Sequence, residues 1–304
     1  MEKIGNVCLN YDYYSGEDMY SDGEIEDVLL DIVKKSTNNS YNDIIFEKKS
    51  WPILYHLSNV RENILNWYNF ADNAKILEVG SGCGAVTGAL LSNNCTVTAI
   101  DLSKKRSLIN AYRHKESENL EIIVGNFNDI AGGLKAKYDY VTLIGVFEYA
   151  DCYITEKNAA DVFLSKIKDL LNENGKIIIA IENQLGLKYF AGCKEDHVGK
   201  FFEGIEGYTT TTGVRTYSKK KITEILARNG FKNMEFYYPY PDYKLPNKIF
   251  TDEALPKAWE LTDNMRNFDS PRMSLFDESK VWNVILEAGL FPEFSNSFLI
   301  VAEK

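Results

Sequence analysis

Histidine and cysteine are scarce in this chain, which leaves little material for a metal centre or a disulfide framework. The 304 residues include three histidines and five cysteines. The cysteines are scattered and odd in number, and none belongs to a CxxC pair or a His/Cys cluster. We therefore expect no bound metal and reduced thiols, as in a cytoplasmic protein.

An excess of basic residues is also lacking. Lysine and arginine number 34 against 44 aspartates and glutamates, so the formal net charge is −10. A protein that binds nucleic acid normally shows a basic surface. The one dense basic run, residues 219–221, follows Ser218 and is typical of the solvated first turn of a helix. We expect no nucleic-acid partner.

No apolar run reaches the roughly 20 residues that a membrane-spanning helix requires. The chain begins with polar and acidic residues and shows no cleavable signal. Its 45% hydrophobic content can nevertheless form a large core. We expect a cytoplasmic protein without membrane contact, and the sequence does not indicate an oligomeric state.

Apolar strand patterns alternate with helical patterns from residue 75 onward. Between the strands lie helical patterns such as 84–93, 159–175 and 218–231. This alternation predicts an α/β fold with a parallel, doubly wound sheet. The expected strands are 74–79, 95–101, 120–126, 138–147, 176–183, 234–240 and 295–304.

The sequence "KILEVGSGCGAVTG", residues 75–88, carries Gly80, Gly82 and Gly84 at alternate positions, where the first strand turns into a helix. At this place backbone N–H groups face a ligand, and glycine lets the ligand approach the chain closely. Residues 80–85 fit the dinucleotide pattern G-x-G-x-x-[G/A]. They also fit the E-x-G-x-G-x-G loop of S-adenosylmethionine enzymes.

Three neighbouring features bear on the choice between these ligands. The carboxylate of Glu78 is unfavourable beside a pyrophosphate but favourable beside a sulfonium or ammonium group. Asp101 ends the second strand and is placed for ribose hydroxyls in either case. Asn126 and Phe127 end the third strand, where an adenine ring could be bound.

In combination, these motifs resemble the class I S-adenosylmethionine-dependent methyltransferases, including bacterial members associated with glycan and surface-polysaccharide gene sets. The resemblance lies in "ILEVGSGCG", Asp101, "GNFND", "YDYVTLIGVFEY" and "LLNENGKIIIAIEN", and for the bacterial subgroup in residues 180–300. It implies a Rossmann-like sheet of seven strands in the order 3-2-1-4-5-7-6, with strand 7 antiparallel. It also implies S-adenosylmethionine as cofactor and S-adenosylhomocysteine as product. The cofactor-binding residues would be Glu78, Gly80, Gly82, Gly84, Asp101, Leu102, Asn126, Phe127 and Val146.

Methyl transfer to a hydroxyl or ammonium group also needs a proton acceptor. The predicted catalytic residues are His197, Glu182 and Glu148, which follow the fifth and fourth strands. A neutral imidazole near pH 7 suits His197 to this task, although a structural hydrogen bond would explain it equally well. Glu182 is the second candidate base. His56 and His114 lie in predicted helices and are expected to be solvated.

Four segments are predicted along the chain. Residues 1–70 would form an N-terminal lid and helices, 71–240 the Rossmann-like core, 241–290 a cap insertion, and 291–304 the final strand. The first 22 residues, rich in tyrosine and acid, favour a mobile lid over a fixed packing arm or a disordered tail.

The sequence therefore predicts a methyltransferase that acts on a small molecule or on a sugar- or glycan-type acceptor, at oxygen or nitrogen. Two other functions stay open: a non-catalytic module that binds S-adenosylmethionine or its product, and an NAD-dependent oxidoreductase. Retention of S-adenosylhomocysteine or of NAD during purification would distinguish the cofactors.

Overall fold

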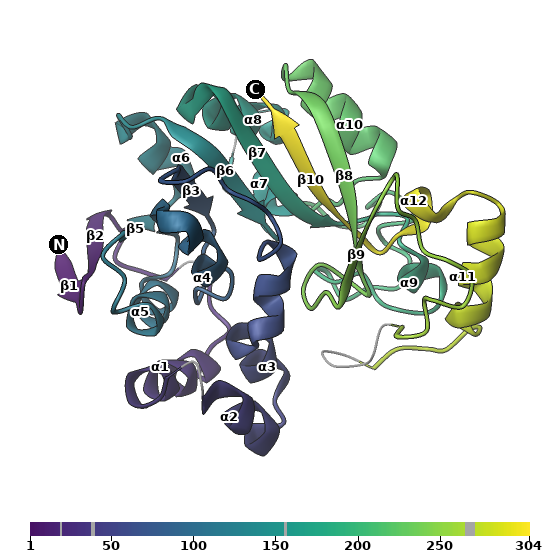
Figure 1. The fold of residues 1–304 in the computed structure, drawn as a ribbon, viewed down its shortest axis with the longest axis horizontal. Helices are drawn as coiled ribbons and strands as arrows, with labels where there is room; N and C mark the ends of the chain where they lie inside the picture. Colours follow the sequence, from purple (N-terminus) through teal and green to yellow (C-terminus); the bar gives the residue numbers. More distant parts are fainter. Residues whose placement is uncertain (19, 38–39, 155–156, 265–270) are drawn as a thin grey trace. The chain divides into compact units, whose positions relative to one another are not determined.

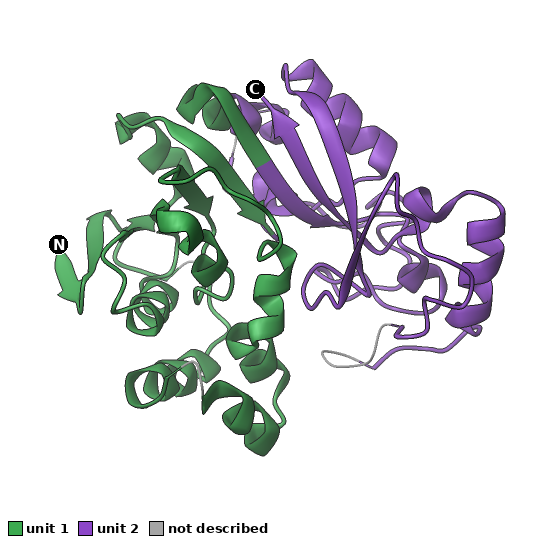
Figure 2. Ribbon diagram, in the orientation of Figure 1, with its two compact units in different colours: residues 1–144, 166–177 green, residues 145–165, 178–304 purple. Residues whose placement is uncertain are grey.

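A computed structural model describes residues 1–18, 20–37, 40–154, 157–264 and 271–304, whose elements are labelled in Figure 1. These residues divide into two compact units, coloured separately in Figure 2. Unit 1 contains residues 1–144 and 166–177, and unit 2 contains residues 145–165 and 178–304. Helix α8 (Ala159–Leu170) and strand β7 (Leu171–Glu182) contribute residues to both units.

Unit 1 is built on a sheet with the strand order β1-β2-β5-β4-β3-β6-β7. β1 and β2 are antiparallel, whereas β2–β5, β5–β4, β4–β3 and β3–β6 are parallel pairs. Ile76, Leu77, Val97 and Ala99 are fully buried, as expected for parallel strands with both faces covered. The strands are β1 (Glu2–Ile4), β2 (Val7–Tyr13), β3 (Lys75–Val79), β4 (Thr96–Asp101), β5 (Leu120–Gly125) and β6 (Tyr138–Ile144).

The N-terminal helices of unit 1 share a hydrophobic core with α5. Their buried side chains meet Ile109 of α5 and Cys83 of the glycine loop in one cluster. Through Cys83, this packing stabilises the glycine loop at which a ligand is expected. The helices are α1 (Ile25–Lys35), α2 (Tyr41–Lys48), α3 (Trp51–Leu57), α4 (Thr87–Leu90), α5 (Lys104–Arg113) and α6 (Phe127–Ile130).

Unit 2 continues from β7 with the strand order β7-β10-β8-β9. β10 pairs antiparallel with β8, and β8 pairs antiparallel with β9. The fully buried residues Phe298 to Ala302, apart from Val301 at 2% exposure, place β10 in the core of this unit. Its strands are β8 (Lys232–Tyr240), β9 (Lys248–Thr251) and β10 (Ser297–Glu303), and its helices are α7 (Ala150–Tyr153), α9 (Leu187–Phe190), α10 (Lys219–Arg228), α11 (Glu278–Glu287) and α12 (Phe291–Phe294).

The predicted parallel α/β architecture is confirmed, but the count of seven strands is wrong. The described residues form ten strands, and β1, β2 and β9 are the additional ones. β9 arises inside the segment predicted as a cap, where residues 248–251 extend the sheet beside β8. The same segment also contains helix α11.

The prediction of an N-terminal lid is wrong for residues 2–13, which are strands of the unit 1 sheet. Val7 and Leu9 are fully buried, while the intervening Cys8 is exposed. This alternation is the period of a half-buried strand, and the surrounding tyrosines and acids obscured it in the sequence. The predicted segment boundaries at residues 70, 240 and 290 stay a prediction. The two compact units are defined by residue contacts, whereas the predicted segments are defined by their functional roles.

Within the part of the chain that the structure describes, every helix is too short or too polar to cross a membrane.

Candidate functional site

The three glycines of the loop after β3 all adopt the left-handed backbone conformation that disfavours other residues. Their φ angles are +74° for Gly80, +53° for Gly82 and +74° for Gly84. A Cβ on Gly84 would lie 2.3 Å from Oδ1 of Asn110, so this glycine permits close packing inside the protein. A Cβ on Gly82 would meet no atom within 4 Å. Gly82 therefore faces open space.

Asp101 holds the glycine loop in place. Its Oδ2 accepts a hydrogen bond from the backbone N–H of Gly82 at 2.7 Å, and its Oδ1 accepts one from that of Ser103 at 2.9 Å. Burial raises the pKa of Asp101, and the two backbone N–H groups and Arg106 oppose this rise. The carboxylate predicted to bind a ribose thus also fixes the backbone beside it.

Glu78 lies beneath the loop, at the end of β3. It is 4% exposed, and its Oε2 accepts a hydrogen bond from Oγ1 of Thr87 at 2.7 Å. Burial raises the pKa of Glu78 to about 8, and the charge of Asp101 adds to the rise. Its side chain is therefore mostly protonated at neutral pH, and a nearby cation would favour the charged form.

The remaining predicted cofactor residues lie at the ends of other strands. Asn126 caps α6, because its Oδ1 accepts a hydrogen bond from the backbone N–H of Asn128 at 2.9 Å. Phe127 is 7% exposed, and Leu102 is half-buried directly after Asp101. Val146 is half-buried and belongs to unit 2. Binding of a cofactor by these residues stays a prediction.

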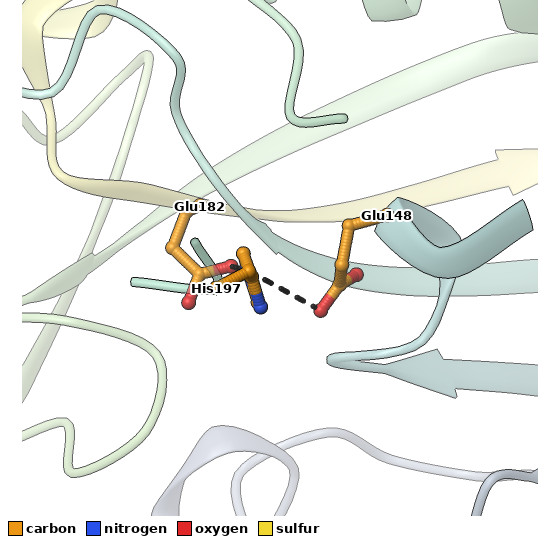
Figure 3. Close-up of side chains that lie close together, drawn as sticks. All are labelled: Glu148, Glu182 and His197. Carbon is orange, nitrogen blue, oxygen red and sulfur yellow. Dashed lines mark hydrogen bonds and ion pairs between the residues drawn. The ribbon is translucent and has the colours of Figure 1, made fainter. Parts of the chain in front are cut away.

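The three predicted catalytic side chains come together inside unit 2, although 34 residues of sequence separate Glu148 from Glu182. We call Glu148, Glu182 and His197 the acidic trio. Nε2 of His197 lies 3.1 Å from Oε2 of Glu182 and 3.9 Å from Oε1 of Glu148 (Figure 3). The Tyr149 hydroxyl lies 2.9 Å from the other ring nitrogen, Nδ1, and so orients the imidazole.

Local structure explains how the trio is positioned. Glu182 is the last residue of β7, and Glu148 lies in the 3-10 turn Phe147–Tyr149. His197 lies in a tight loop whose backbone N–H groups at His197 and Val198 donate to Oε2 of Glu195, both at 2.8 Å. The loop histidine is thereby directed at the end of a core strand.

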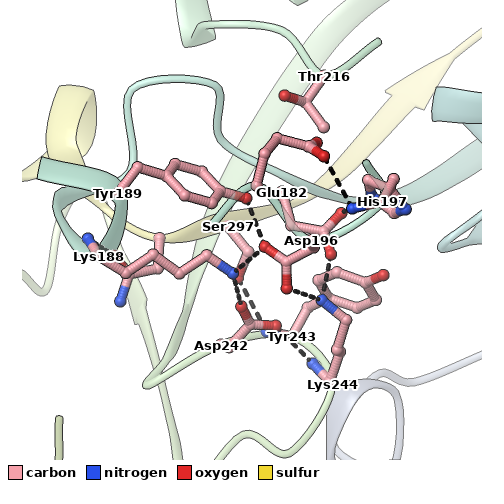
Figure 4. A network of polar contacts seen from close by, with 12 residues as sticks. Glu182, Lys188, Tyr189, Asp196, His197, Thr216, Asp242, Tyr243, Lys244 and Ser297 are labelled. Carbon is pink, nitrogen blue, oxygen red and sulfur yellow. Dashed lines mark hydrogen bonds and ion pairs between the residues drawn. The ribbon is translucent and has the colours of Figure 1, made fainter. Parts of the chain in front are cut away.

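Glu182 and His197 of the trio also belong to a larger, mostly buried polar cluster (Figure 4). Lys244 bonds Oε1 of Glu182 and lies 2.8 Å from Oδ1 of Asp196. Lys188, which is 1% exposed, lies 2.8 Å from Asp196 and 2.7 Å from Asp242. Lysine and carboxylate thus alternate through the cluster, so most of its buried charges are paired.

The charge states within the trio differ from those expected from the sequence. Burial alone would lower the pKa of His197, but the Glu182 carboxylate outweighs it and raises that pKa to about 9. Burial opposes the charge on Glu182, yet Lys244 and His197 hold its pKa below the usual range. Burial and the charge of Glu182 raise the pKa of Glu148 to about 8.

The Glu182 carboxylate therefore favours the charged imidazolium form of His197, against the neutral imidazole that the sequence suggested near pH 7. Burial and the same carboxylate favour the protonated form of Glu148. The base role of His197 stays a prediction. His197 can accept a proton only after its own proton is lost, which moves any base function to alkaline pH.

Two further sequence expectations fail on burial. His56 and His114 are 4% and 8% exposed, so they are not solvated. His56 lies 3.0 Å from Asp22, and Nε2 of His114 lies 3.1 Å from the carbonyl oxygen of Gly84. Burial lowers the pKa of His114 to about 4, so it stays neutral and serves as a packing residue behind the glycine loop.

Sequence reasoning missed the two lysines of the cluster, the buried Lys188 and the half-buried Lys244. Each stands in an aromatic or apolar segment, "LGLKYF" and "YPDYKLP". A lysine in such a segment is either exposed or paired in the interior, and this signal could have identified both. Three of the four tyrosines in residues 237–243 are buried, so they pack and do not present a sugar-binding face.

Comparison with known proteins supplies a domain assignment. Residues 77–177 match the family described as "Methyltransferase domain". The chain is 31% identical over 104 residues to the ribosomal RNA small subunit methyltransferase A of Borreliella afzelii, a match that covers 30% of this chain and 37% of that relative. The chain thus spans little more than a third of the length of such relatives.

Two longer but weaker similarities extend beyond the glycine loop. The ubiquinone biosynthesis O-methyltransferase of Rickettsia canadensis is 25% identical over 232 residues, which cover 69% of this chain and 93% of that relative. A solved S-adenosylmethionine-dependent methyltransferase from Archaeoglobus fulgidus is 16% identical, covers 86% of this chain and 99% of its own, and has a TM-score of 0.49.

The domain match lies on β3, the glycine loop, β4 with Asp101, β5 and β6, which are the elements that the sequence assigned to cofactor binding. Residues 77–177 are therefore similar to a methyltransferase domain, and the matched span contains the glycine loop and Asp101.

Proposed function

We propose that this chain transfers the methyl group of S-adenosylmethionine to a hydroxyl or amine of a small organic acceptor, with sugars and glycans included in that class. The observation that carries the proposal is the glycine loop of the methyltransferase domain. Its left-handed Gly82 faces open space and is fixed by the Asp101 carboxylate at 2.7 Å. This arrangement supports a ligand that lies on the backbone and donates hydroxyl hydrogen bonds to Asp101.

Two observations favour a small acceptor over RNA. The similarity to ribosomal RNA methyltransferases covers 30% of the chain, whereas that to the ubiquinone O-methyltransferase covers 69%. The net charge of −10 opposes binding to a polyanion. The sequence also resembles bacterial methyltransferases associated with glycan gene sets. For this reason the proposed class of acceptors includes sugar hydroxyls.

The buried cluster of unit 2 supports specific roles for the acidic trio. His197, with 7% of its side chain exposed, would accept the proton of the acceptor group. Glu182, at 3.1 Å, would hold the ring and stabilise the imidazolium that forms. Glu148 would add a second carboxyl group that gains charge only above a pH of about 8.

Binding and turnover test the proposal separately. Calorimetry should show one S-adenosylmethionine per chain and no comparable heat with NAD. The purified chain is then incubated with S-adenosylmethionine and a panel of phenols, sugars and amines, and S-adenosylhomocysteine is quantified. Formation of product with an acceptor supports an enzyme. Binding without product for any acceptor class would favour the non-catalytic module, and binding of NAD alone would overturn the proposal.

His197→Gln tests the base role once an acceptor is found. Loss of a general base lowers turnover by about 10² to 10⁴-fold, with little change in cofactor affinity. Wild-type turnover should rise with pH toward about 9, because His197 must first lose its proton. His56→Gln is the matched control, a buried histidine that also faces a carboxylate. Near-normal turnover of His197→Gln at every pH would remove His197 from the proposed mechanism.

A further inference from the structure

Glu148 is a buried carboxyl group without a hydrogen bond to another described residue. Its exposed fraction is 2%, and neither side-chain oxygen has such a partner. The side chain is directed at His197 and Glu182 (Figure 3). A carboxylate removed from water is unfavourable unless a cation or a donor compensates it. Its surroundings therefore favour a positively charged ligand.

The orientation of His197 is compatible with the same conclusion. Nδ1 faces the Tyr149 hydroxyl at 2.9 Å, so Nε2 is the ring nitrogen that faces the two carboxyl groups. Nε2 lies 3.1 Å from Oε2 of Glu182. Without a ligand, a proton on Nε2 bridges these two atoms, and a metal cation can take the place of that proton.

The spacing of the three groups approaches that of ligands around one ion. Ligand atoms that bind the same metal at about 2.1 Å lie roughly 3 to 4 Å from each other. The two distances from Nε2, 3.1 Å to Glu182 and 3.9 Å to Glu148, fall in this range. All three ligand atoms lie within 4.8 Å of one another, so a small shift of one carboxyl group places them around one ion. Lys244 occupies Oε1 of Glu182, so Oε2 is the oxygen directed at the trio.

The formal charge of the cluster is compatible with a divalent cation. The cluster has five carboxyl groups and two lysines in addition to His197, and with Glu148 and His197 protonated its formal charge is −4 + 3 = −1. A divalent cation that replaces both protons leaves this charge unchanged, at −5 + 4 = −1. The side chains of Glu148 and Glu182 are 0% exposed, so an organic acceptor does not reach them, whereas an ion is small enough to do so. The groups counted are Glu148, Glu182, Glu195, Asp196, Asp242, Lys188 and Lys244.

We propose that Glu148, Glu182 and His197 bind one divalent first-row transition-metal ion. One imidazole and two carboxylates suit Mn²⁺, Fe²⁺ or Zn²⁺ better than the all-oxygen preference of Ca²⁺ and Mg²⁺. The sequence predicted no metal, because the three ligands are not neighbours along the chain. This inference goes beyond the proposed methyl transfer and does not depend on it. With an ion bound, His197 has no lone pair for a proton, so ion binding and the base role exclude each other.

Mn²⁺ is the probe, because carboxylate and imidazole ligands suit this ion. Zn²⁺ is less suitable, because the exposed thiols of Cys8 and Cys152 would bind it away from the trio. Chelator-treated full-length chain is titrated with Mn²⁺, and the free ion is followed by electron paramagnetic resonance without S-adenosylmethionine or acceptor. We expect one tightly bound Mn²⁺ per chain and a melting temperature that rises with its concentration. Glu148→Gln and His197→Gln should weaken binding at least about tenfold. Glu278→Gln is the matched control, a buried glutamate of unit 2 paired with Arg272, and should bind like wild type.

The proposal is overturned if the folded wild-type chain binds no Mn²⁺ stoichiometrically, or if both trio variants bind it like the control. Circular dichroism confirms that each variant is folded. If the variants unfold, the imidazole resonances of the wild-type chain are followed by nuclear magnetic resonance during the Mn²⁺ titration. Mn²⁺ bound at the trio must broaden the His197 resonance, and an unaffected His197 resonance refutes the site. Cofactor binding is measured in a separate titration, so failure of the metal site and failure of the methyltransferase proposal are distinguishable.

Discussion

Replacing Asp101 by asparagine removes one charge and one acceptor while keeping the size of the side chain. In the protein Oδ2 accepts from Gly82 and Oδ1 from Ser103, both backbone N–H groups. An asparagine amide offers one acceptor oxygen and one NH₂ group, so it can satisfy only one of these donors. The other backbone N–H then faces the NH₂ group of the asparagine, which is also a donor. The loss of this hydrogen bond loosens either the glycine loop or the start of α5.

The expected loss of cofactor affinity follows from the hydrogen bonds to the ribose. A hydrogen bond to a charged group contributes about 1.5 to 3 kcal/mol, and tenfold in affinity corresponds to about 1.4 kcal/mol. Asp101→Asn should therefore raise the dissociation constant of S-adenosylmethionine by roughly 10- to 150-fold. Burial raises the pKa of Asp101, so part of the loss is offset by relief of a buried charge, and the lower end of this range is the firmer expectation.

Asp139→Asn supplies a matched control within unit 1. Its carboxylate also accepts two N–H groups, from the backbone of Lys75 at 2.9 Å and from the side chain of Asn172 at 2.6 Å. It lies near the amino end of β6, whereas Asp101 lies at the carboxyl end of β4. Calorimetry should show wild-type affinity for Asp139→Asn. Equal affinity of Asp101→Asn and wild type, or an equal loss in both variants, would refute the reasoning.

Three further predictions concern stability. Burial raises the pKa of Glu78 from 4.5 to about 8, so the unfolded chain loses this proton first and the native state loses stability as pH rises between these values. The melting temperature of Glu78→Gln should therefore rise relative to that of wild type as pH increases from 5 to 8. A difference in melting temperature that does not change with pH would contradict the raised pKa. Lys188→Met leaves the buried Asp242 without its ion-pair partner and leaves Asp196 with Lys244 alone, so it should cost about 3 to 5 kcal/mol in urea unfolding. Lys35→Met, at an exposed pair, should cost less than about 1 kcal/mol. Similar losses in the two variants would show that the buried pairs do not stabilise the fold. Deletion of residues 1–13 removes a paired strand with two fully buried side chains and should lower the melting temperature by about 10 °C or more, while an unchanged value would restore the lid hypothesis.

The N-terminal segment illustrates why composition alone misled the interpretation. Tyrosine, acid and glycine dominate residues 10–23, and no helical period is visible there. The alternation of Val7 and Leu9 is too short to indicate a strand without a neighbour. Only pairing with β5 shows that these residues complete a sheet, because strand formation depends on a partner that lies more than 100 residues away in the sequence.

By itself, the sequence determined the parallel α/β core and the glycine loop, which lies in the span that matches a methyltransferase domain. Strand periodicity, Gly80, Gly82 and Gly84 and the position of Asp101 are local properties, because backbone conformation and a strand end are encoded over a few residues. The sequence also selected Glu148, Glu182 and His197 individually. Only the tertiary structure decided that they meet, that Lys188 and Lys244 enter the same cluster, and that the Glu182 carboxylate raises the pKa of His197. These properties depend on burial and on charges brought together from distant segments, and no local pattern encodes them.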